Sequence, residues 1–257
     1  MYSCNIIAHR GANKRAPQNT LPAFLKAIEL GCDGFETDVH LSKDGVPVIC
    51  HNDTIDATSD GTGRISDLTL EELKSHDFGS YFSKDFAGTT LPTLDEFLDV
   101  AASGNLKILN IELKKEPDDK RRDELVTKTL EAVEKHGLSD ILLISSFSVK
   151  ILRLVRQKNP ACKTALLYPN GYFRAVETVF PPIMLMVGLG CSASHPHKLC
   201  IRDGYVKQCH GKNLKVNVWT VDEAEEIRNM LRAGVDSIIT DCPDRVRFIL
   251  QEMNEAK

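Results

Sequence analysis

Short apolar, strand-like runs alternate with amphipathic, helix-like segments along almost the whole chain of 257 residues. Strand-then-helix repeats of this kind form a parallel sheet whose faces are covered by helices. Roughly eight such units can be counted, and eight units in a chain of this length predict a (β/α)8 TIM-type barrel. We therefore expect a single barrel domain over residues 1–257.

The boundaries of the expected elements follow from apolar periodicity and from turn and cap residues. We expect strands over residues 5–9, 33–38, 46–50, 107–112, 141–145, 163–167, 184–189, 215–219 and 236–240. We expect helices over residues 20–30, 94–103, 120–136, 148–158, 173–179, 198–212, 222–233 and 243–254. Residues 38–50 form an extra hairpin in this scheme, turning at Lys43-Asp44-Gly45.

A doubly wound open sheet is the alternative fold for the same order of elements. It would normally carry a glycine-rich turn after its first strand, and His9-Arg10-Gly11-Ala12-Asn13 is not such a turn.

Residues 53–92 interrupt the alternation, and a structureless loop of that length is unusual in a compact domain. We expect them to form a small inserted subdomain after the second strand region, covering one side of the barrel's active-site end.

Composition argues against several classes of partner. The net charge is −4 and there is no long basic run, so neither nucleic acid nor an anionic membrane is an expected partner. The apolar run from Phe180 to Gly190 is shorter than the roughly 18 residues that cross a bilayer. With no transmembrane segment and no signal peptide expected, we predict a cytoplasmic protein. No apolar stripe identifies an oligomer interface.

Eight cysteines are present, without a Cys-x-x-Cys pair, and several lie in or beside strand-like runs. We expect free, structural thiols. A zinc site is an alternative for one segment, although its spacing matches no usual structural-zinc pattern; the residues are Cys191, His195, His197, Cys200, Cys209 and His210. For His195 two interpretations stay open, a strand-end position facing the site and a solvated loop position beside Pro196.

Charged and histidine side chains collect where strand-like runs end. They are His9 and Arg10, Glu36 and Asp38, His51, and Glu112 and Lys114. Alternate residues of a strand share a face, so Glu36 and Asp38 point the same way. The carboxyl ends of barrel strands meet at one mouth, where these side chains are expected to converge.

This combination of groups suits a metal ion and an anion. Clustered carboxylates repel one another unless a cation offsets them, and oxygen ligands favour Mg²⁺, Ca²⁺ or Mn²⁺. Three carboxylates and one divalent cation together have a charge of about −1. Arg10 and Lys114 bring the charge of the pocket to about +1, which suits a phosphodiester with one negative charge. Two histidines can supply the base and the acid for its hydrolysis. Taken singly, each histidine has a structural alternative, and the charged pairs could be a solvated strand face or a plain ion pair.

The chain resembles the glycerophosphodiester phosphodiesterase family, which is related to the phosphatidylinositol-type phospholipase C barrels. The similarity extends in family order from residue 7 to residue 244. The matching stretches are His9-Arg10-Gly11, Pro17-Gln18-Asn19-Thr20, Glu36-Thr37-Asp38-Val39, Lys43-Asp44-Gly45-Val46-Pro47-Val48, His51-Asn52-Asp53-Thr54, Leu91-Pro92-Thr93-Leu94, Ile111-Glu112-Leu113-Lys114, Ser145-Ser146-Phe147-Ser148, Val218-Trp219-Thr220-Val221 and Thr240-Asp241-Cys242-Pro243-Asp244.

The resemblance implies metal-dependent hydrolysis of a small-molecule glycerophosphodiester to sn-glycerol 3-phosphate and an alcohol. It implies an acid/base pair, His9 and His51, and ligands for one divalent cation, Ca²⁺ or Mg²⁺ with Mn²⁺ as a further candidate, at Glu36, Asp38 and Glu112. It also implies phosphate contacts from Arg10 and Lys114, and pocket walls near the alcohol from Phe147 and Trp219. Packing inside the barrel is the alternative for the two aromatic residues. Residues 53–92 correspond to the family's insertion.

Two positions depart from the family pattern. Gln18 stands where the family usually has glutamate, and Asn52 where it usually has aspartate. Both changes remove a negative charge near the mouth. Two other functions remain open: a lysophospholipase D-like enzyme for acylated substrates, with an apolar wall from Phe180 to Leu189, and a phosphodiester-binding barrel that has lost catalysis.

Overall fold

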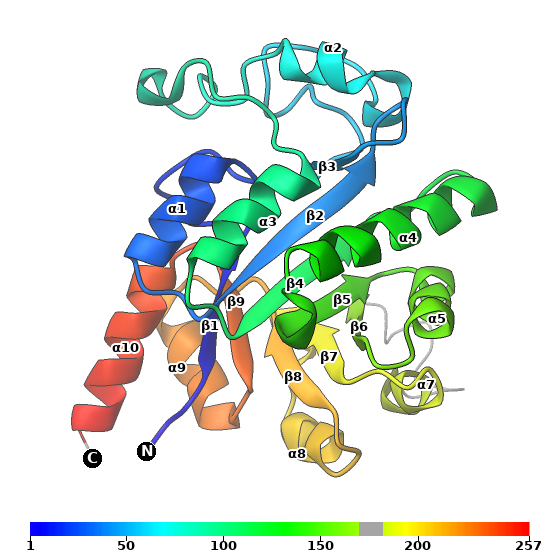
Figure 1. The fold of residues 1–257 in the computed structure, drawn as a ribbon. Helices are drawn as coiled ribbons and strands as arrows, with labels where there is room; N and C mark the ends of the chain where they lie inside the picture. Colours follow the sequence, from blue (N-terminus) through cyan, green and yellow to red (C-terminus); the bar gives the residue numbers. More distant parts are fainter. Residues whose placement is uncertain (170–181, 257) are drawn as a thin grey trace.

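Residues 1–169 and 182–256 are described by the computed structural model (Figure 1). Within these ranges eight parallel strands close into a barrel surrounded by helices. They are β1 (Asn5–His9), β2 (Gly34–Leu41), β4 (Ile108–Leu113), β5 (Leu142–Ser146), β6 (Lys163–Tyr168), β7 (Ala193–Pro196), β8 (Lys215–Val218) and β9 (Ser237–Thr240).

The barrel closes because β1 pairs on one side with β9 and on the other with β2. An open sheet ends in two edge strands, whereas each of the eight parallel strands here has a paired neighbour on both sides, so the predicted (β/α)8 fold is confirmed. The predicted hairpin is also present, because β3 (Pro47–Ile49) pairs antiparallel with β2.

Helices cover the outside of the barrel (Figure 1), and apolar side chains of α1 and α3 are buried in the core. Phe24 of α1, Phe35 of β2 and Phe97 of α3 form one such contact, with ring centroids 4.6 to 6.0 Å apart. Burial of each ring contributes about 2 kcal/mol. The helices are α1 (Leu21–Glu29), α3 (Leu94–Ser103), α4 (Asp119–Lys135), α5 (Val149–Lys158), α7 (Pro182–Gly188), α8 (Tyr205–His210), α9 (Ala224–Ala233) and α10 (Pro243–Glu255).

Residues 53–92 are structured and lie beyond the carboxyl end of β2, next to β3 (Figure 1). They contain η1 (Ile65–Asp67), α2 (Leu70–Lys74) and η2 (Lys84–Phe86). A separate apolar cluster joins the segment to the hairpin, and it consists of Val48, Cys50, Ile55, Ile65, Leu73, Phe78 and Leu91. The segment thus stands at the end of the barrel where the site residues emerge.

One predicted strand is wrong. Residues 184–189 fall mostly in the helix α7, and the strand at this point of the barrel is β7, over Ala193–Pro196. A short apolar run does not distinguish a helix from a buried strand. Ala193-Ser194-His195-Pro196 has no β-branched residue to signal a strand, and its pairing with β6 and β8 makes it one.

Two further helix predictions differ in outcome. The helix expected over 198–212 is divided into η4 (Lys198–Cys200) and α8, with Gly204 between them at a φ of 77°. A positive φ is readily adopted by glycine and ends a continuous helix. The helix expected over 173–179 lies outside the described residues.

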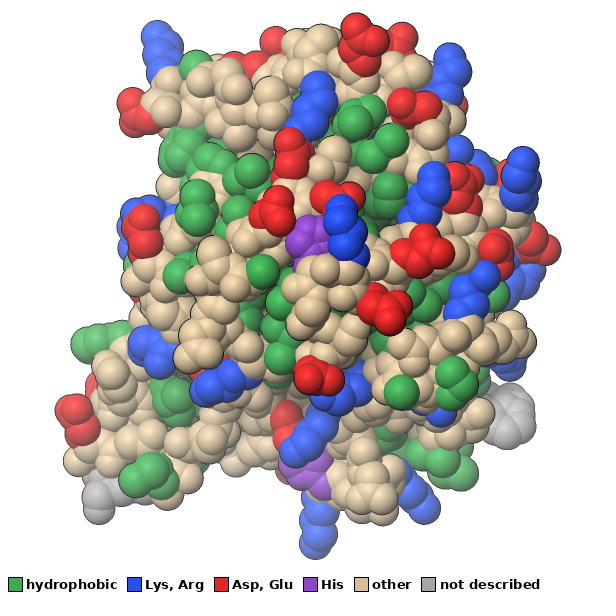
Figure 2. Space-filling view, in the orientation of Figure 1, with side chains coloured by type: hydrophobic (Ala, Val, Ile, Leu, Met, Phe, Trp, Pro, Cys, Tyr) green, Lys and Arg blue, Asp and Glu red, His purple; other side chains and the backbone are tan. Residues whose placement is uncertain are grey.

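Several surface and compositional expectations can be compared with the structure. In the part of the chain that the structure describes, no helix combines the length and apolarity needed to span a bilayer. Lys and Arg side chains are intermixed with Asp and Glu on the face shown in Figure 2.

All eight cysteines are free thiols. Among residues 182–256, the cysteines and histidines of 191–210 do not form a metal-ligand cluster.

Candidate active site

Strand register brings the predicted residues into adjacent rows at the mouth of the barrel. His9 is paired with Glu36 between β1 and β2, and Glu36 with Asn110 between β2 and β4. The next row pairs Asp38 with Glu112. A cavity of about 150 Å³ opens here, and its walls are His9, Arg10, Glu36, His51, Asn110, Glu112, Phe147, Leu167, Trp219 and Ile239.

Three buried carboxylates form the centre of the site. One oxygen from each of Glu36, Asp38 and Glu112 lies within 4.8 Å of the others. Burial raises the pKa of Glu112 to about 7, because the charged form is desolvated and Asp38 repels it. Burial and the same repulsion raise the pKa of Glu36 well above its ordinary value. Protonation of these groups competes with any cation that binds here.

Lys114 and Arg10 offset part of this negative charge. The Nζ atom of Lys114 lies 2.7 Å from Oδ1 of Asp38 and 2.6 Å from Oε1 of Glu112. The Nε atom of Arg10 lies 3.4 Å from Oδ2 of Asp38. Burial alone would raise the pKa of Asp38, but these two cations outweigh it and hold the pKa below its ordinary range. Burial alone would lower the pKa of Lys114, but the contacts with Asp38 and Glu112 outweigh burial and raise it.

His9 is held by a carboxylate from the other end of the chain. Its Nδ1 atom lies 2.6 Å from Oδ1 of Asp241, the residue that follows β9. The Asn13 side-chain amide donates to the same Asp241 oxygen at 2.6 Å. With Nδ1 engaged, Nε2 is the ring nitrogen available to a substrate, and it lies 4.0 Å from Oε2 of Glu36. Asp241 thereby fixes the orientation of the ring.

His51 has a neutral partner instead. Its Nδ1 atom lies 2.7 Å from Oδ1 of Asn52. An amide oxygen only accepts, so Nδ1 of His51 carries the hydrogen and Nε2 keeps its lone pair. Burial lowers the pKa of His51 to about 4, and Asp38 offsets this only in part. Asn52, which stands where the family usually has aspartate, therefore still orients the His51 ring. It lacks the negative charge that would stabilise the imidazolium.

Gln18, the other departure, joins the rim to the inserted segment. The Arg10 guanidinium donates to Oε1 of Gln18 at 2.6 Å. The backbone N–H of Gln18 donates to the Tyr81 hydroxyl of residues 53–92 at 3.2 Å. Glutamine thus accepts the hydrogen bond from Arg10 without adding a charge.

Phe147 and Trp219 stand at the wall of the cavity. Their rings are perpendicular, with centroids 5.9 Å apart, and Phe147 is 48% exposed. Phe147 is therefore not packed inside the barrel, as the alternative interpretation required. The Trp219 indole N–H donates to the carbonyl oxygen of His195 at 2.8 Å, which positions the indole against β7.

The solvated-loop interpretation of His195 is wrong. The residue lies in β7, is fully buried, and its Nε2 atom is 2.8 Å from the Asn217 amide nitrogen. It is not among the residues that line the cavity. Inward-facing positions of a barrel strand are buried by the facing strands, so its place beside Pro196 was misleading as a sign of a loop.

Two residues of the site were missed from the sequence. Asp241 lies directly after the last strand, and this strand-end position was the available signal. Asn110 lies two residues before Glu112 on the same strand face, and period-two alternation could have indicated it.

The donor chemistry of the site fits a hard divalent cation. Three carboxylates supply oxygen ligands, which Ca²⁺ and Mg²⁺ prefer, and their mutual repulsion is the cost that a cation removes. Glu36, Asp38 and Glu112 are the residues that would hold it.

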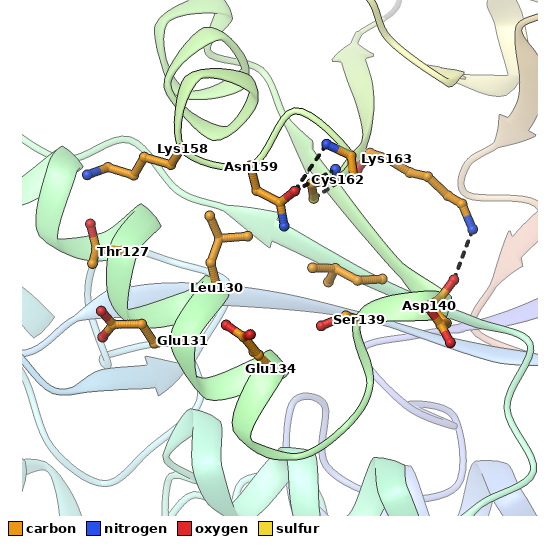
Figure 3. Close-up of a pocket in the computed structure, with 12 residues that line it drawn as sticks. Thr127, Leu130, Glu131, Glu134, Ser139, Asp140, Lys158, Asn159, Cys162 and Lys163 are labelled. Atoms are coloured by element: carbon orange, nitrogen blue, oxygen red, sulfur yellow. Dashed lines mark hydrogen bonds between the residues drawn. The ribbon is translucent and has the colours of Figure 1, made fainter.

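A larger cavity of about 680 Å³ lies elsewhere, between the carboxyl-terminal parts of α4 and α5 (Figure 3). Two of its polar side chains already have partners: Lys163 donates to the carbonyl of Asp140, and Asn159 accepts from the backbone of Cys162. Acids and lysines are among the residues that line it, but no histidine is, and its acids do not form a cluster like the one at the mouth. Size alone therefore does not identify the site.

A closed parallel barrel with carboxylates, imidazoles and cations at its mouth has the groups that a phosphoric diester hydrolase of the TIM-barrel type requires. The sequence matches the family model described as the glycerophosphoryl diester phosphodiesterase family over residues 9–245. The chain belongs to this family.

Individual relatives agree over nearly the full chain. A glycerophosphodiester phosphodiesterase from Caldanaerobacter subterraneus is 37% identical over 239 residues, covering 93% of this chain and 94% of the relative. The structure of an Oleispira antarctica phosphodiesterase in complex with the product sn-glycerol-3-phosphate is similar with a TM-score of 0.84 and 29% identity, covering 96% of each chain. A glycerophosphodiester phosphodiesterase from Agrobacterium tumefaciens has a TM-score of 0.80 and 26% identity, covering 95% of this chain and 98% of its own.

Proposed function

We propose that the protein hydrolyses glycerophosphodiesters to sn-glycerol 3-phosphate and an alcohol, using one divalent cation and two histidines. The observation that carries the proposal is that His9 and His51 line one cavity together with Glu36 and Glu112. Separate segments of the chain thus supply an acid/base pair beside a cluster able to hold a cation. The product complex of the Oleispira relative supports the glycerophosphate part of the substrate.

Arg10 and Lys114 bind and orient the phosphodiester in this proposal. Both are cationic, and both lie against the carboxylate cluster rather than at a remote surface. Because Arg10 is held by Gln18, its guanidinium is positioned before the substrate arrives. Positioning of this kind lowers the entropic part of the barrier.

Glu36, Asp38 and Glu112 would hold the cation, either Ca²⁺ or Mg²⁺, with Mn²⁺ as a further candidate. When bound, it would supply electrostatic stabilisation of charge on the phosphoryl oxygens. The carboxylates repel the anionic substrate without it, so their charge has to be offset for the phosphodiester to enter.

His9 and His51 move the protons of the reaction. One imidazole removes a proton from the attacking hydroxyl, which forms a new bond to phosphorus, and the other gives a proton to the alkoxide that leaves. The hydroxyl belongs either to water or to the glycerol 2-position, the latter giving a cyclic phosphate. Asp241 and Asn52 orient the two rings, and they differ in charge. Phe147 and Trp219 form the wall past which the departing alcohol leaves.

The direct test is turnover of glycerophosphocholine with Ca²⁺ or Mg²⁺, compared with EDTA. We expect loss of activity with EDTA and in His9→Ala, with folding retained. Retention of more than a few per cent of activity in His9→Ala would remove the acid/base assignment. Complete inactivity of the metal-loaded wild type would instead favour a phosphodiester-binding barrel. Phosphorus-31 NMR during turnover distinguishes water from the cyclic route.

Glycerophosphoethanolamine, glycerophosphoinositol and lysophosphatidylcholine extend the same screen. Preference for the lysolipid would indicate the lysophospholipase D-like alternative. Of the apolar wall expected for that activity, Ile183 and Met186 are buried in an apolar core, whereas Met184 and Val187 are exposed. Residues 180 and 181 lie outside the described ranges.

We further propose a single domain over 1–257 in which 53–92 acts as an inserted subdomain. The proposed location is the cytoplasm, which cell fractionation tests.

A further inference from the structure

Asn13 contacts both members of the His9–Asp241 pair, and the proposed reaction gives it no role. Its side-chain nitrogen donates to the main-chain oxygen of His9 at 2.9 Å and to Oδ1 of Asp241 at 2.6 Å. Both partners are acceptors, so they require the amide to present its nitrogen rather than its oxygen. Asn13 lies in the loop between β1 and α1, whereas Asp241 follows β9. One side chain therefore bridges the two strands at which the barrel closes.

The Asp241 carboxylate has more than one direction in which it can turn. Its main chain is held separately, because the Asp241 N–H donates to Oδ1 of Asp222 at 2.8 Å. Oδ1 of Asp241 accepts from His9, while Oδ2 lies 3.7 Å from Nζ of Lys14, a side chain that is 60% exposed. Rotation toward Lys14 would take the carboxylate away from Nδ1 of His9. The hydrogen bond from Asn13 opposes that rotation, because it binds the same oxygen that His9 binds.

The loop that carries Asn13 is fixed against α1, so the amide is a stationary donor. The N–H of Ala12 donates to the carbonyl of Ala23 at 2.9 Å, and the N–H of Asn13 donates to the carbonyl of Gly11 at 3.0 Å. Gly11 has a φ of 80°, and a Cβ atom there would lie 2.6 Å from the backbone of Ala23. Only glycine permits this close approach. A donor held in this way can orient its acceptor.

The charge state of Asp241 agrees with such a role. Burial alone would raise the pKa of Asp241, but its contacts with His9, Asn13 and Lys14 outweigh burial and lower it. The group therefore accepts as a carboxylate, and a hydrogen bond to an ionised acceptor is stronger than one between neutral groups.

We infer that Asn13 is a positioning residue of the proposed reaction, holding the Asp241 carboxylate in line with Nδ1 of His9 so that Nε2 stays directed at the substrate. The inference rests on the proposed function, and the effect of Asn13 passes through Asp241. Asn13 is not among the residues that line the cavity, so its loss should lower kcat and leave KM unchanged.

Two other accounts predict different results. In one, Lys14 holds the carboxylate, although an exposed ion pair of this kind contributes little. In the other, Asn13 only stabilises its loop, in which case its removal should lower the melting temperature without acting through Asp241.

The test measures kcat and KM for glycerophosphocholine with saturating Ca²⁺. Asn13→Ala and the near-isosteric Asn13→Leu, which excludes a replacement water, should lower kcat about 10-fold or more with an unchanged KM. In an Asp241→Ala background, Asn13→Leu should cause no further loss, because its acceptor is already gone. Lys14→Met should keep the wild-type kcat.

Asn159→Ala is the matched control. It also removes two side-chain hydrogen bonds, from the backbone of Ala161 and Cys162, beside the cavity of Figure 3. Its melting temperature should fall while kcat is retained. An unchanged kcat in Asn13→Leu, a loss confined to KM, or equal losses with and without the Asp241 carboxylate would overturn the inference. So would a loss in Lys14→Met as large as that in Asn13→Leu.

Proton NMR provides a readout that does not need turnover. The Nδ1 proton of His9, identified by its absence in His9→Ala, should give a signal shifted downfield by the short contact with Asp241. This signal should move upfield in Asn13→Leu and stay in place in Asn159→Ala. A signal that does not respond to Asn13→Leu would overturn the inference. If the signal responds but the wild type hydrolyses no diester, the proposed function fails and the positioning of His9 by Asn13 through Asp241 stands.

Discussion

Lys114 should stabilise the metal-free protein through the carboxylates that it contacts. Its side chain is 13% exposed, and its Nζ atom lies within 2.7 Å of carboxylate oxygens of Asp38 and Glu112, which are themselves buried. Substitution by methionine keeps the volume and removes the charge. Asp38 retains Arg10 and the Asn19 amide, at 3.4 and 2.8 Å, so Glu112 is the group left without compensation.

The cost of Lys114→Met can be bounded. Breaking a buried ion pair on one side costs about 3 to 5 kcal/mol. Burial already raises the pKa of Glu112 to about 7, so the variant can take up a proton there and limit the loss. We therefore expect about 3 kcal/mol at pH 8, and a melting temperature lower by roughly 6 to 12 °C for a domain of this size.

The dependence on pH and on cations provides the sharper check. The ion pair requires ionised carboxylates, so the deficit of Lys114→Met should shrink as the pH falls from 8 to 5. Added Ca²⁺ should recover part of it, because the cation replaces the missing positive charge. Thermal unfolding with EDTA and then with Ca²⁺ measures both effects. Lys135→Met removes an exposed pair with Asp95 and should leave the melting temperature unchanged. If Lys114→Met resembles this control at pH 8, the reasoning is refuted.

Three more predictions concern the proton-transfer groups and the cation. Asp241→Asn should lower kcat by about 10²- to 10⁴-fold with the fold retained, because the His9 imidazolium loses its carboxylate; steady-state kinetics measure this, and an unchanged kcat would contradict it. Asn52→Asp should raise the pKa of His51 by about 1 unit or more from its lowered value; NMR titration of the ring measures the shift, and an equal or lower pKa would exclude the charge effect. Affinity for Ca²⁺ should fall as the pH drops through about 7, because Glu112 then holds a proton that the cation must displace; calorimetry at pH 6 and pH 8 tests this, and equal affinities would mean that protons and the cation do not compete there.

Strand-end chemistry could be predicted from the sequence because it depends on position along a strand. Glu36 and Glu112 each lie in an apolar strand, and parallel strands in a barrel bring such positions to one mouth. Where local pattern was ambiguous the prediction failed. The apolar residues 184–189 form most of α7, and the weakly patterned β7 is a strand because its neighbours pair with it.

Hydrogen-bond partners could not be predicted in the same way. His9 and Asp241 are 232 residues apart in the sequence, and their contact exists because closure of the barrel places β9 beside β1. Asn110 and Asn217 are both asparagines of barrel strands. Asn217 has a side-chain partner at His195, whereas Asn110 lines a cavity.

The amino-acid sequence by itself determined the barrel class and the residue types at the strand ends, since both follow from short-range periodicity and chain order. The tertiary structure alone decided that Asp241 holds His9, that Lys114 bridges Asp38 and Glu112, and that Asn110 lines the cavity. These outcomes depend on strand register and on barrel closure, which bring distant residues within a few ångströms and which no local pattern encodes.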